Sequence, residues 1–454
     1  MKLFRLWLIA AAVAFLLFLV SGNSLAQNGE NARALFADEI HSSVEEDYPY
    51  LDNLYKYLHA HPELSFHESE TAAQIAEELG SLGFEVTTDV GGHGLVGVLK
   101  NGDGPTVMIR TDLDALPVKE NTGLDYASTV TTTDDQGKEV GVMHACGHDV
   151  HMTVFTGTAR ILTQMKDAWQ GTLVLIGQPA EEKGAGAKAM LADGLYTRFP
   201  RPDYAIALHV NAGMPTRSIG YCKGYALANV DAVDILVRGI GGHGAYPHTT
   251  KDPVVISAQI IMALQTIVSR EIKPIEPAVV TVGSIHGGTK HNIIPDEVHL
   301  QLTLRSYSDQ VRNQTIATIR RISKGIAQAA GVPEGRLPVV TVQDEFTPAT
   351  YNDPELTERL VKVWQRTLGS EHVVKTEPVM GGEDFGRYGR EEPNLPICMF
   401  WLGTVSYDSF EDSQQEGEPL PSLHSSRFAP IPEPTIKTGV KAMTSAALEL
   451  LQAN

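Results

Sequence analysis

The segment VMHACGHDVHM, residues 142–152, concentrates residue types that bind metals or act as nucleophiles: His144, Cys146, His148, Asp149 and His151. A cysteine thiolate together with imidazoles is a common ligand set for transition metals. A cysteine beside a histidine can also be the nucleophile of a thiol hydrolase. A third interpretation is a reduced, buried cysteine beside surface histidines. The density of ligand-type residues favours the metal site.

The spacing of Cys146 and His148 sets a condition on the backbone that carries them. Residues two apart do not face each other on a helix, whereas they share a face on an extended segment. Gly147 between them gives the chain the freedom to make a tight turn. We therefore predict a loop, followed by a helix that begins near Val150. Asp149 either caps that helix or supports a ligand by accepting a hydrogen bond.

Other ligand-type residues stand where predicted strands end. Asp112 and Asp114 follow 106–111, Glu181 and Glu182 follow 172–178, and His209 lies near the end of 204–210. Ligands of parallel α/β sheets bind beyond the carboxyl ends of the strands. These side chains are therefore expected to meet in one site.

The adjacent carboxylates Glu181 and Glu182 suit hydrolytic chemistry. One carboxylate can bind a metal while its neighbour holds a proton. A metal lowers the pKa of water, and a nearby base takes the proton and later gives it to the leaving group. The alternative is a solvated acidic helix start, which the helix dipole would favour.

The elements that must position these residues alternate between strands and helices. The apolar stretches are 106–112, 172–182, 204–210 and 396–405, and helix-like stretches include 151–166 and 184–193. This alternation predicts an α/β domain with a largely parallel core sheet. Residues 27–48 are predicted to be frayed, and residues 408–422 are predicted to form an exposed loop.

The order of predicted strands and helices changes in the middle of the chain. From about Tyr225 the order becomes strand, helix, strand, strand, helix, which predicts an open-faced α+β sandwich inserted into the α/β domain. The predicted domains are a signal peptide at 1–26, the first part of the catalytic domain at 27–224, the inserted lid or dimerisation domain at 225–340, and the second part of the catalytic domain at 341–454.

The N-terminus has the layout of a secretory signal peptide. Lys2 and Arg5 precede an apolar run from Leu6 to Val20, and small residues suitable for cleavage follow at 24–26. The run is shorter than the ~20 residues of a spanning helix, although an uncleaved anchor is the alternative. We therefore expect an exported protein, periplasmic or secreted.

The net charge limits the binding partners of the chain, and the cysteine content limits its disulfide bonds. Removal of residues 1–26, with two positive charges, changes the formal net charge from −19 to −21. Such an acidic chain is a poor partner for nucleic acid or for an anionic membrane. Three cysteines are too few for a disulfide framework. Cys222 and Cys398 could pair, and the sequence does not decide whether they do.

Eight motifs occur in an order that resembles one known family. They are HPELSFHESETA (61–72), TDLDALP (111–117), MHACGHDVH (143–151), GQPAEE (177–182), GGHGAYPH (241–248), HNIIPDEV (291–298), GGEDFG (381–386) and LHSSRF (423–428). Together they resemble the M20 metallopeptidase superfamily in its amidohydrolase branch. That branch includes aminoacylase-like enzymes, hippurate hydrolases and indole-acetyl-amino-acid hydrolases.

The resemblance implies a role for particular residues. The positions that match ligands of two divalent metal ions are Cys146, His148, Glu182, His209 and His424. Glu181 matches the general base, and Asp114 matches an acidic residue behind the metal site. His243 matches an inserted-domain histidine that reaches a neighbouring active site across a homodimer and helps to stabilise the oxyanion. Asn292 matches a substrate-contacting asparagine, and Arg305 is either a carboxylate-binding residue or a surface charge. Zn²⁺ and Mn²⁺ suit these ligands best, with Co²⁺ or Ni²⁺ as options.

The predicted activity is metal-dependent hydrolysis of the amide bond of N-acyl-amino acids. The alternative within the class is an exported carboxypeptidase or dipeptidase that acts on short peptides. Two further alternatives are a non-catalytic ligand-binding protein and a thiol hydrolase that uses Cys146. Retention of Glu181 and all five ligand positions argues against a non-catalytic protein. Chelator sensitivity would separate the metal enzyme from the thiol hydrolase.

Overall fold

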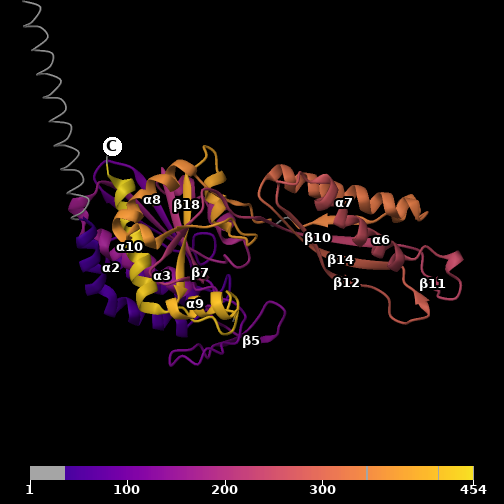
Figure 1. Ribbon diagram of the computed structural model, residues 1–454, viewed down its shortest axis with the longest axis horizontal. Coiled ribbons are helices and arrows are strands. Elements are labelled where there is room, and N and C mark those ends of the chain that lie inside the picture. Colours follow the sequence, from indigo (N-terminus) through magenta and orange to yellow (C-terminus); the bar gives the residue numbers. More distant parts are fainter. Residues whose placement is uncertain (1–35, 344–345, 418, 453–454) are drawn as a thin grey trace, which may run out of the picture.

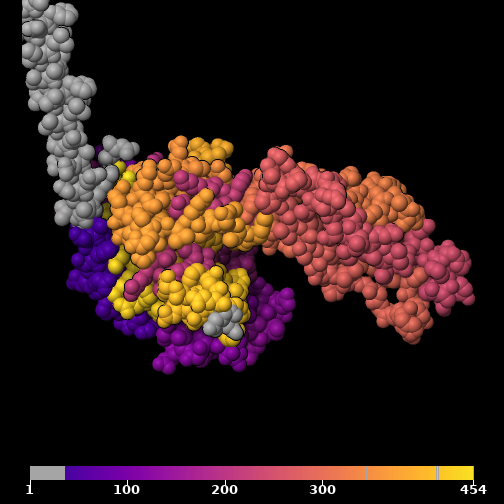
Figure 2. Space-filling view, viewed as in Figure 1, coloured from indigo at the N-terminus to yellow at the C-terminus, as the bar shows by residue number. Residues whose placement is uncertain are grey.

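The computed structural model describes residues 36–343, 346–417 and 419–452. The predicted signal segment, residues 1–26, lies outside these ranges. The described chain forms two lobes (Figures 1 and 2). The main lobe comprises residues 36–228 and 347–452 and contains a large central sheet. A smaller elongated lobe, here named the sandwich, comprises residues 229–342.

The main lobe is built on an eight-stranded sheet in the order β1-β2-β6-β3-β7-β18-β8-β17. In that order the strands are Glu85–Thr87, Leu95–Asn101, Gly171–Gln178, Thr106–Asp112, Tyr204–Pro215, Ile397–Val405, Ile219–Tyr221 and Val373–Lys375. The central strands β6, β3, β7 and β18 pair in parallel, whereas β1, β2 and β6 pair in antiparallel fashion. The predicted α/β fold with a mostly parallel core sheet is confirmed.

Alternate residues of the central strands enter two different cores. On β3, Val107 and Ile109 join the core on one face of the sheet, whereas Met108 joins the core on the other. This two-residue period is the geometry of a strand. Because helices cover both faces, these strands are apolar throughout instead of alternating with polar residues.

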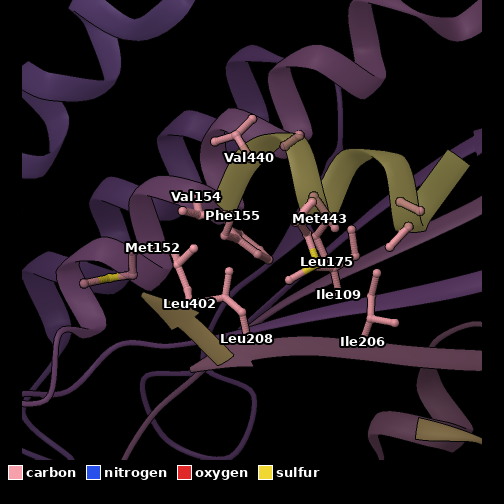
Figure 3. Close-up of a cluster of buried hydrophobic side chains, with 14 of the residues drawn as sticks. Ile109, Met152, Val154, Phe155, Leu175, Ile206, Leu208, Leu402, Val440 and Met443 are labelled. Atoms are coloured by element: carbon pink, nitrogen blue, oxygen red, sulfur yellow. The ribbon is translucent and has the colours of Figure 1, made fainter. Parts of the chain in front are cut away.

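Helices α3 and α10 cover one face of the sheet. Met152, Val154 and Phe155 of α3 pack with Val440 and Met443 of α10 above strand residues Ile109, Leu175, Ile206, Leu208 and Leu402 (Figure 3). The helices of the main lobe are residues 36–60, α2 Ser69–Ser81, α3 His148–Gln164, α4 Gly186–Ala192, α5 Leu195–Arg198, α8 Pro354–Leu368, α9 Tyr407–Glu416 and α10 Pro432–Leu451. A 3-10 segment, η6, runs from Asp384 to Arg390.

Two local predictions were wrong. Residues 36–48 are helical and not frayed, because Ile40, Val44 and Leu51 lie on one helix face and are buried in the core. Residues 408–416 belong to helix α9 and not to a loop. Ser406 caps α9 by accepting a hydrogen bond from the Ser409 amide at 3.1 Å, so a polar sequence still forms a helix here.

The sandwich has its own sheet and core. Its strands lie in the order β12-β14-β10-β15 and are all antiparallel. Its elements are β10 Asn229–Arg238, α6 Pro253–Thr266, β12 Ala278–His286, β14 Glu297–Ser306, α7 Asp309–Ala329 and β15 Val339–Val342. Buried and partly exposed residues alternate strictly along β10 because helices cover only one face of the sheet. The predicted open-faced α+β architecture is therefore present.

Short elements complete the chain. They are β4 Thr131–Thr133 with β5 Glu139–Gly141, β9 Gly224–Leu227 with β16 Thr350–Asn352, and β11 Gly242–His243 with β13 Ile293–Ile294. The β9–β16 pair connects the lobes, because the chain enters the sandwich after β9 and returns just before β16. Cys146, Cys222 and Cys398 are all free and buried, so Cys222 and Cys398 are not bonded to each other.

Candidate metal centre

Six predicted site residues converge beyond the carboxyl ends of β3, β6 and β7. The ligand atoms of Cys146, His148 and His209 all lie within 4.8 Å of one another. The same holds for Cys146, Glu182 and His424, and for His148, Glu181 and Glu182. Residues from four separate segments of sequence therefore form one cluster.

Two histidines of the cluster are oriented by backbone carbonyls. Nδ1 of His148 lies 2.7 Å from the carbonyl oxygen of Asp114, and Nδ1 of His209 lies 2.8 Å from that of Val210. A carbonyl can only accept a hydrogen bond, so each Nδ1 carries a proton and donates it. In the neutral ring the lone pair is therefore on Nε2, which is the atom that faces the cluster in both residues.

The donor distances fit a bound cation. Sγ of Cys146 lies 3.6 Å from Nε2 of His209, and Nε2 of His148 lies 3.9 Å from Oε1 of Glu182. Nε2 of His424 lies 3.6 Å from Oε2 of Glu182. Two ligands on one tetrahedral zinc, with bonds of about 2.0–2.3 Å, are separated by roughly 3.3–3.8 Å. The first and third distances fall in this range, and the two distances between nitrogen and oxygen are longer than those of ordinary hydrogen bonds.

Buried polar atoms without a hydrogen-bond partner also support a bound cation. Nε2 of His148 and Oε1 of Glu182 are buried and have no hydrogen-bond partner within the described part of the chain. Buried polar atoms nearly always have one. Although burial disfavours a charge on His148, Asp112 and Asp114 raise its pKa to about 10. The position therefore stabilises a positive charge, and the residues present fit divalent metal ions.

The surroundings of Cys146 do not activate a nucleophile. Burial and the carboxylates of Glu182 and Glu181 raise the pKa of its thiol well above the usual range. Burial lowers the pKa of the neighbouring His209, so no imidazolium stabilises a thiolate. Reactive cysteines have lowered pKa values. A thiolate at this position requires a bound cation, which favours the ligand role over the thiol hydrolase.

His424 forms the open side of the cluster. It follows α9 in a loop and has a φ of +67°, a conformation that few non-glycine residues adopt. Its amide donates to the carbonyl of Ala145 at 2.8 Å, which holds the loop against the cysteine segment. The side chain of His424 is 56% exposed, whereas that of His148 is fully buried. The cluster is therefore open to solvent on this side.

Asp114 lies behind the cluster. Its side chain accepts a hydrogen bond from Ser65 at 2.6 Å and from the amide of Glu182 at 3.0 Å. Its other carboxylate oxygen lies 3.3 Å from Nδ1 of His148. Although burial disfavours the charge, these contacts keep the pKa of Asp114 low. Asp114 thus connects two predicted ligands, His148 and Glu182.

Glu181 lies among further carboxylates. Its carboxylate oxygens are within 4.8 Å of those of Glu383 and Asp384. Burial, then the charges of Glu383 and Glu182, raise the pKa of Glu181 well above its usual range. Buried Arg110 compensates part of this charge by donating to Glu383 at 2.8 Å and to Asp384 at 3.2 Å. The sequence marked the GGEDFG motif but offered no role for Glu383 and Asp384.

Asp112 and His151 support the cluster from behind, a role that the sequence indicated for neither residue. Nδ1 of His151 lies 2.7 Å from Asp112, and Nε2 accepts the Val210 amide at 3.0 Å. Both ring nitrogens are occupied, so His151 does not serve as a ligand. Arg110 also donates to Asp112 at 2.7 Å. The only signal for Asp112 in the sequence was its position at the end of the predicted strand 106–111.

The prediction for Asp149 is corrected. Helix α3 begins at His148 and its N-cap residue is Gly147, with φ +77°. Asp149 lies inside the first turn, where it accepts the amide of Val150 at 2.9 Å and Nδ1 of His59 at 2.6 Å. The other ring nitrogen of His59 lies 3.1 Å from Glu120. Sequence reasoning missed this buried His59 link because its partners are far apart in the chain.

The three site residues that were predicted in the sandwich do not lie at the ligand cluster. His243 on β11 and Asn292 are exposed neighbours, joined by the Gly244 amide and the Asn292 carbonyl at 2.8 Å. They lie at the end of the sandwich remote from the main lobe (Figure 1). Arg305 on β14 is half-buried and donates to Thr303 at 2.5 Å and to the Leu304 carbonyl at 3.0 Å. None of the three joins the cluster within one chain.

Comparison with known proteins agrees with this arrangement. Residues 108–448 match the peptidase family M20/M25/M40. The chain belongs to this family. It is 36% identical over 416 residues to thermostable carboxypeptidase 1 of Saccharolobus solfataricus, covering 91% of this chain and 98% of the relative. The M20 chain is 37% identical to N-acetyldiaminopimelate deacetylase of Limosilactobacillus fermentum, covering 86% of this chain and 94% of the relative.

A solved structure of the M20 family also matches. The YXEP protein of Bacillus subtilis, described as a dinuclear metal-binding peptidase, aligns with a TM-score of 0.72 and 28% identity. The alignment covers 90% of this chain and 99% of that structure. The expected membership of the amidohydrolase branch is confirmed. The chain is a metal-dependent hydrolase of amides with a centre for two divalent ions.

Proposed function

We propose that this M20 enzyme hydrolyses the amide bond between an acyl group and an amino acid. The observation that carries the proposal is the buried Glu181 beside the ligand cluster that opens to solvent at His424. The relative named a deacetylase supports an acyl-amino acid as substrate. The relative named a carboxypeptidase supports the second candidate, cleavage of short peptides.

The chain's own residues supply the proton transfers. Two bound divalent ions would lower the pKa of water and polarise the substrate carbonyl. Glu181 takes a proton from the attacking water and gives it to the leaving nitrogen. The raised pKa of Glu181 suits the second step, in which it acts as an acid. Glu182, Cys146 and the histidines would hold the ions, and Asp114 orients His148.

The donor set guides the choice of metal. One thiolate, one carboxylate and three imidazoles suit Zn²⁺ or Mn²⁺, and Co²⁺ or Ni²⁺ are further options. We propose Zn²⁺ or Mn²⁺. Elemental analysis of protein purified without added metal identifies the native ion. Two equivalents of either metal are expected per chain.

A homodimer through the sandwich would complete the site. His243 and Asn292 lie far from the cluster of their own chain, so a role in catalysis requires another copy. Helix α6 supports this arrangement because its outer face exposes Val255 at 53% and Met262 at 71%. Pro253–Glu271 has the length and apolarity of a membrane span, yet Ile256, Ile260 and Leu264 pack into the sandwich core. We propose that the outer face contacts a second copy.

The location of the protein remains a proposal from its N-terminal sequence. We propose that residues 1–26 direct export and are removed, so that the enzyme works in the periplasm or is secreted. The charged start, the apolar run and the small residues at 24–26 support this. Mass spectrometry of the mature N-terminus tests it. A chain that retains residues 1–26 in the membrane fraction would contradict it.

A substrate panel tests the proposed activity. Residues 27–454 loaded with Zn²⁺ or Mn²⁺ are assayed for amine release from N-acetyl-, N-benzoyl- and indole-acetyl-amino acids and from dipeptides, with and without chelator. Chelator-sensitive release from acyl-amino acids is expected. Release from dipeptides alone would select the peptidase instead. No release from any compound, with two metals bound, would contradict both activities and favour a binding protein.

A further inference from the structure

We propose that a cavity between the two lobes binds a small organic cation. The cavity has a volume of about 590 Å³, within the range of small-molecule sites. Its walls include three tyrosines, Tyr225, Tyr307 and Tyr351. Charged side chains at the cavity include Asp309, Asp353, Arg390 and Glu392.

The tyrosine rings form an aromatic corner. The rings of Tyr225 and Tyr351 have centroids 4.9 Å apart and planes at 78°, so they make an edge-to-face contact and stand nearly perpendicular to each other. Tyr307 stacks on Tyr225, with centroids 5.6 Å apart and planes at 26°. Tyr225 and Tyr351 are 37% and 48% exposed, which leaves ring surface open. Aromatic faces are negative, and perpendicular faces of this kind bind alkylated ammonium groups.

Tyr307 offers the cavity a hydrogen-bonding group. It is only 8% exposed although it lines the cavity. Its hydroxyl is not one of the enclosed polar atoms of the described chain that lack a partner, so it is open to the cavity. A ligand with a hydroxyl or amine group would hydrogen-bond to it.

The charges of the cavity favour a cation over an anion. Arg390 is already paired, since its guanidinium contacts both carboxylate oxygens of Asp309 at 2.6 and 3.2 Å. Asp353 caps helix α8 by accepting the amides of Glu355 and Leu356. Glu392 has no ion pair in the described chain. Three carboxylates and one neutralised guanidinium leave the cavity negative.

The cavity is separate from the metal centre. Ile397, the first residue of β18, lines the cavity, whereas Trp401 of the same strand contacts the ring of His209. Four residues of strand span about 13 Å, so the cavity lies at the start of β18 and the ring of His209 contacts the middle of the strand. Tyr307 and Asp309 belong to the sandwich, whereas Tyr351 and Glu392 belong to the main lobe. A ligand that contacts both lobes would favour one orientation of the sandwich.

Calorimetric titration of the metal-loaded chain 27–454 tests the site with choline and its neutral carbon isostere, 3,3-dimethylbutan-1-ol. Choline is expected to bind at least about fivefold more tightly than the isostere. Tyr351→Leu and Glu392→Gln should each weaken choline binding by about fivefold or more. The exposed control substitutions Tyr57→Leu and Glu77→Gln, neither of which lines the cavity, should leave choline binding unchanged. Thermal unfolding of each variant verifies that it is folded.

Three results would overturn the proposal. Equal affinity for choline and the isostere would show that charge is not recognised. Choline binding that is unaffected by both Tyr351→Leu and Glu392→Gln would place the ligand elsewhere. Affinity that falls in His424→Ala while Tyr351→Leu binds normally would place the cation at the metal centre.

Discussion

The carbonyl oxygen of Asp114 accepts a hydrogen bond from Nδ1 of His148 at 2.7 Å. This contact fixes the tautomer and the ring plane of a ligand without using a side chain. The carboxylate of the same Asp114 accepts the amide of Glu182, so one residue orients ligands from α3 and from the loop after β6. These contacts hold the predicted ligands in position, which lowers the cost of binding a metal.

Glu181→Gln should lower kcat/KM by about 10²–10⁴-fold, because the amide cannot take or return a proton. Metal content should stay at the wild-type value, since the proposed role of Glu181 is proton transfer and the proposed ligand is Glu182. Steady-state kinetics and elemental analysis measure both quantities. Glu77→Gln, on the exposed face of α2, is the control and should keep full activity. Wild-type turnover by Glu181→Gln would refute the assigned role.

Cys146→Ser should reduce bound metal and activity together, because a hydroxyl is a much weaker zinc ligand than a thiolate. Iodoacetamide should label Cys146 only after chelation. Cys398→Ser is the matched control, since Cys398 is also buried but contacts the Thr357 hydroxyl at 3.6 Å and belongs to none of the candidate metal groups among the described residues. The thiol-hydrolase alternative predicts the opposite pattern, namely activity that survives chelator and is lost on alkylation.

Gly147→Ala should weaken metal binding through the backbone. Gly147 has a φ of +77°, where an alanine costs roughly 1–2 kcal/mol. An added Cβ would also lie 2.7 Å from Cγ2 of Val210 and would push apart the segments of Cys146 and His209. Gly123→Ala has the same φ of +77° with no atom within 4 Å of the added Cβ. If both variants lose equal metal affinity, measured by chelator competition, the packing argument fails.

His59→Gln should destabilise the fold by about 3–5 kcal/mol, because it leaves Asp149 and Glu120 buried without their cation. Although burial disfavours the charge, those two carboxylates raise the pKa of His59 from 6.5 to about 10. The stabilisation is complete below pH 6.5 and is lost as the pH rises through about 10.

Urea unfolding at pH 6 and pH 9 measures this pH dependence. The wild-type free energy of unfolding should fall between these values by up to about 1.4 kcal/mol per pH unit from His59 alone. The His59→Gln variant should fall less, so the two curves converge towards pH 10. Parallel curves would mean that His59 is not charged at neutral pH.

Mixed dimers test the role of His243 across an interface. Glu181→Gln and His243→Ala chains should each be nearly inactive. After subunit exchange, a mixed dimer has one centre with its own Glu181 and with His243 of the partner subunit, so about a quarter of all centres become active. Glu181→Gln mixed with His424→Ala is the control, because no centre regains both residues. Exchange without recovered activity would exclude the proposed trans arrangement.

The sequence alone determined the chemistry of the centre and the type of fold. Cys146 precedes the glycine of a predicted turn, Glu182 follows an apolar strand, and His209 lies near the end of another. Residue type and local pattern were therefore enough to predict a shared site. The parallel sheet could be predicted for the same reason, because strands buried on both faces form continuous apolar runs. These are properties of short stretches of chain, which a single sequence displays directly.

Tertiary structure decided which distant residues support the ligands. His59 meets Asp149 across 90 positions, and Arg110 meets Glu383 across 273 positions. No local pattern encodes such pairs, because burial and opposite charge select partners only after the strands and helices have packed. The helix at 36–48 depends on tertiary structure in the same way, because its few apolar residues are buried only when the helix packs against the core. The position of His243, far from the centre of its own chain, likewise follows from how the sandwich joins the main lobe.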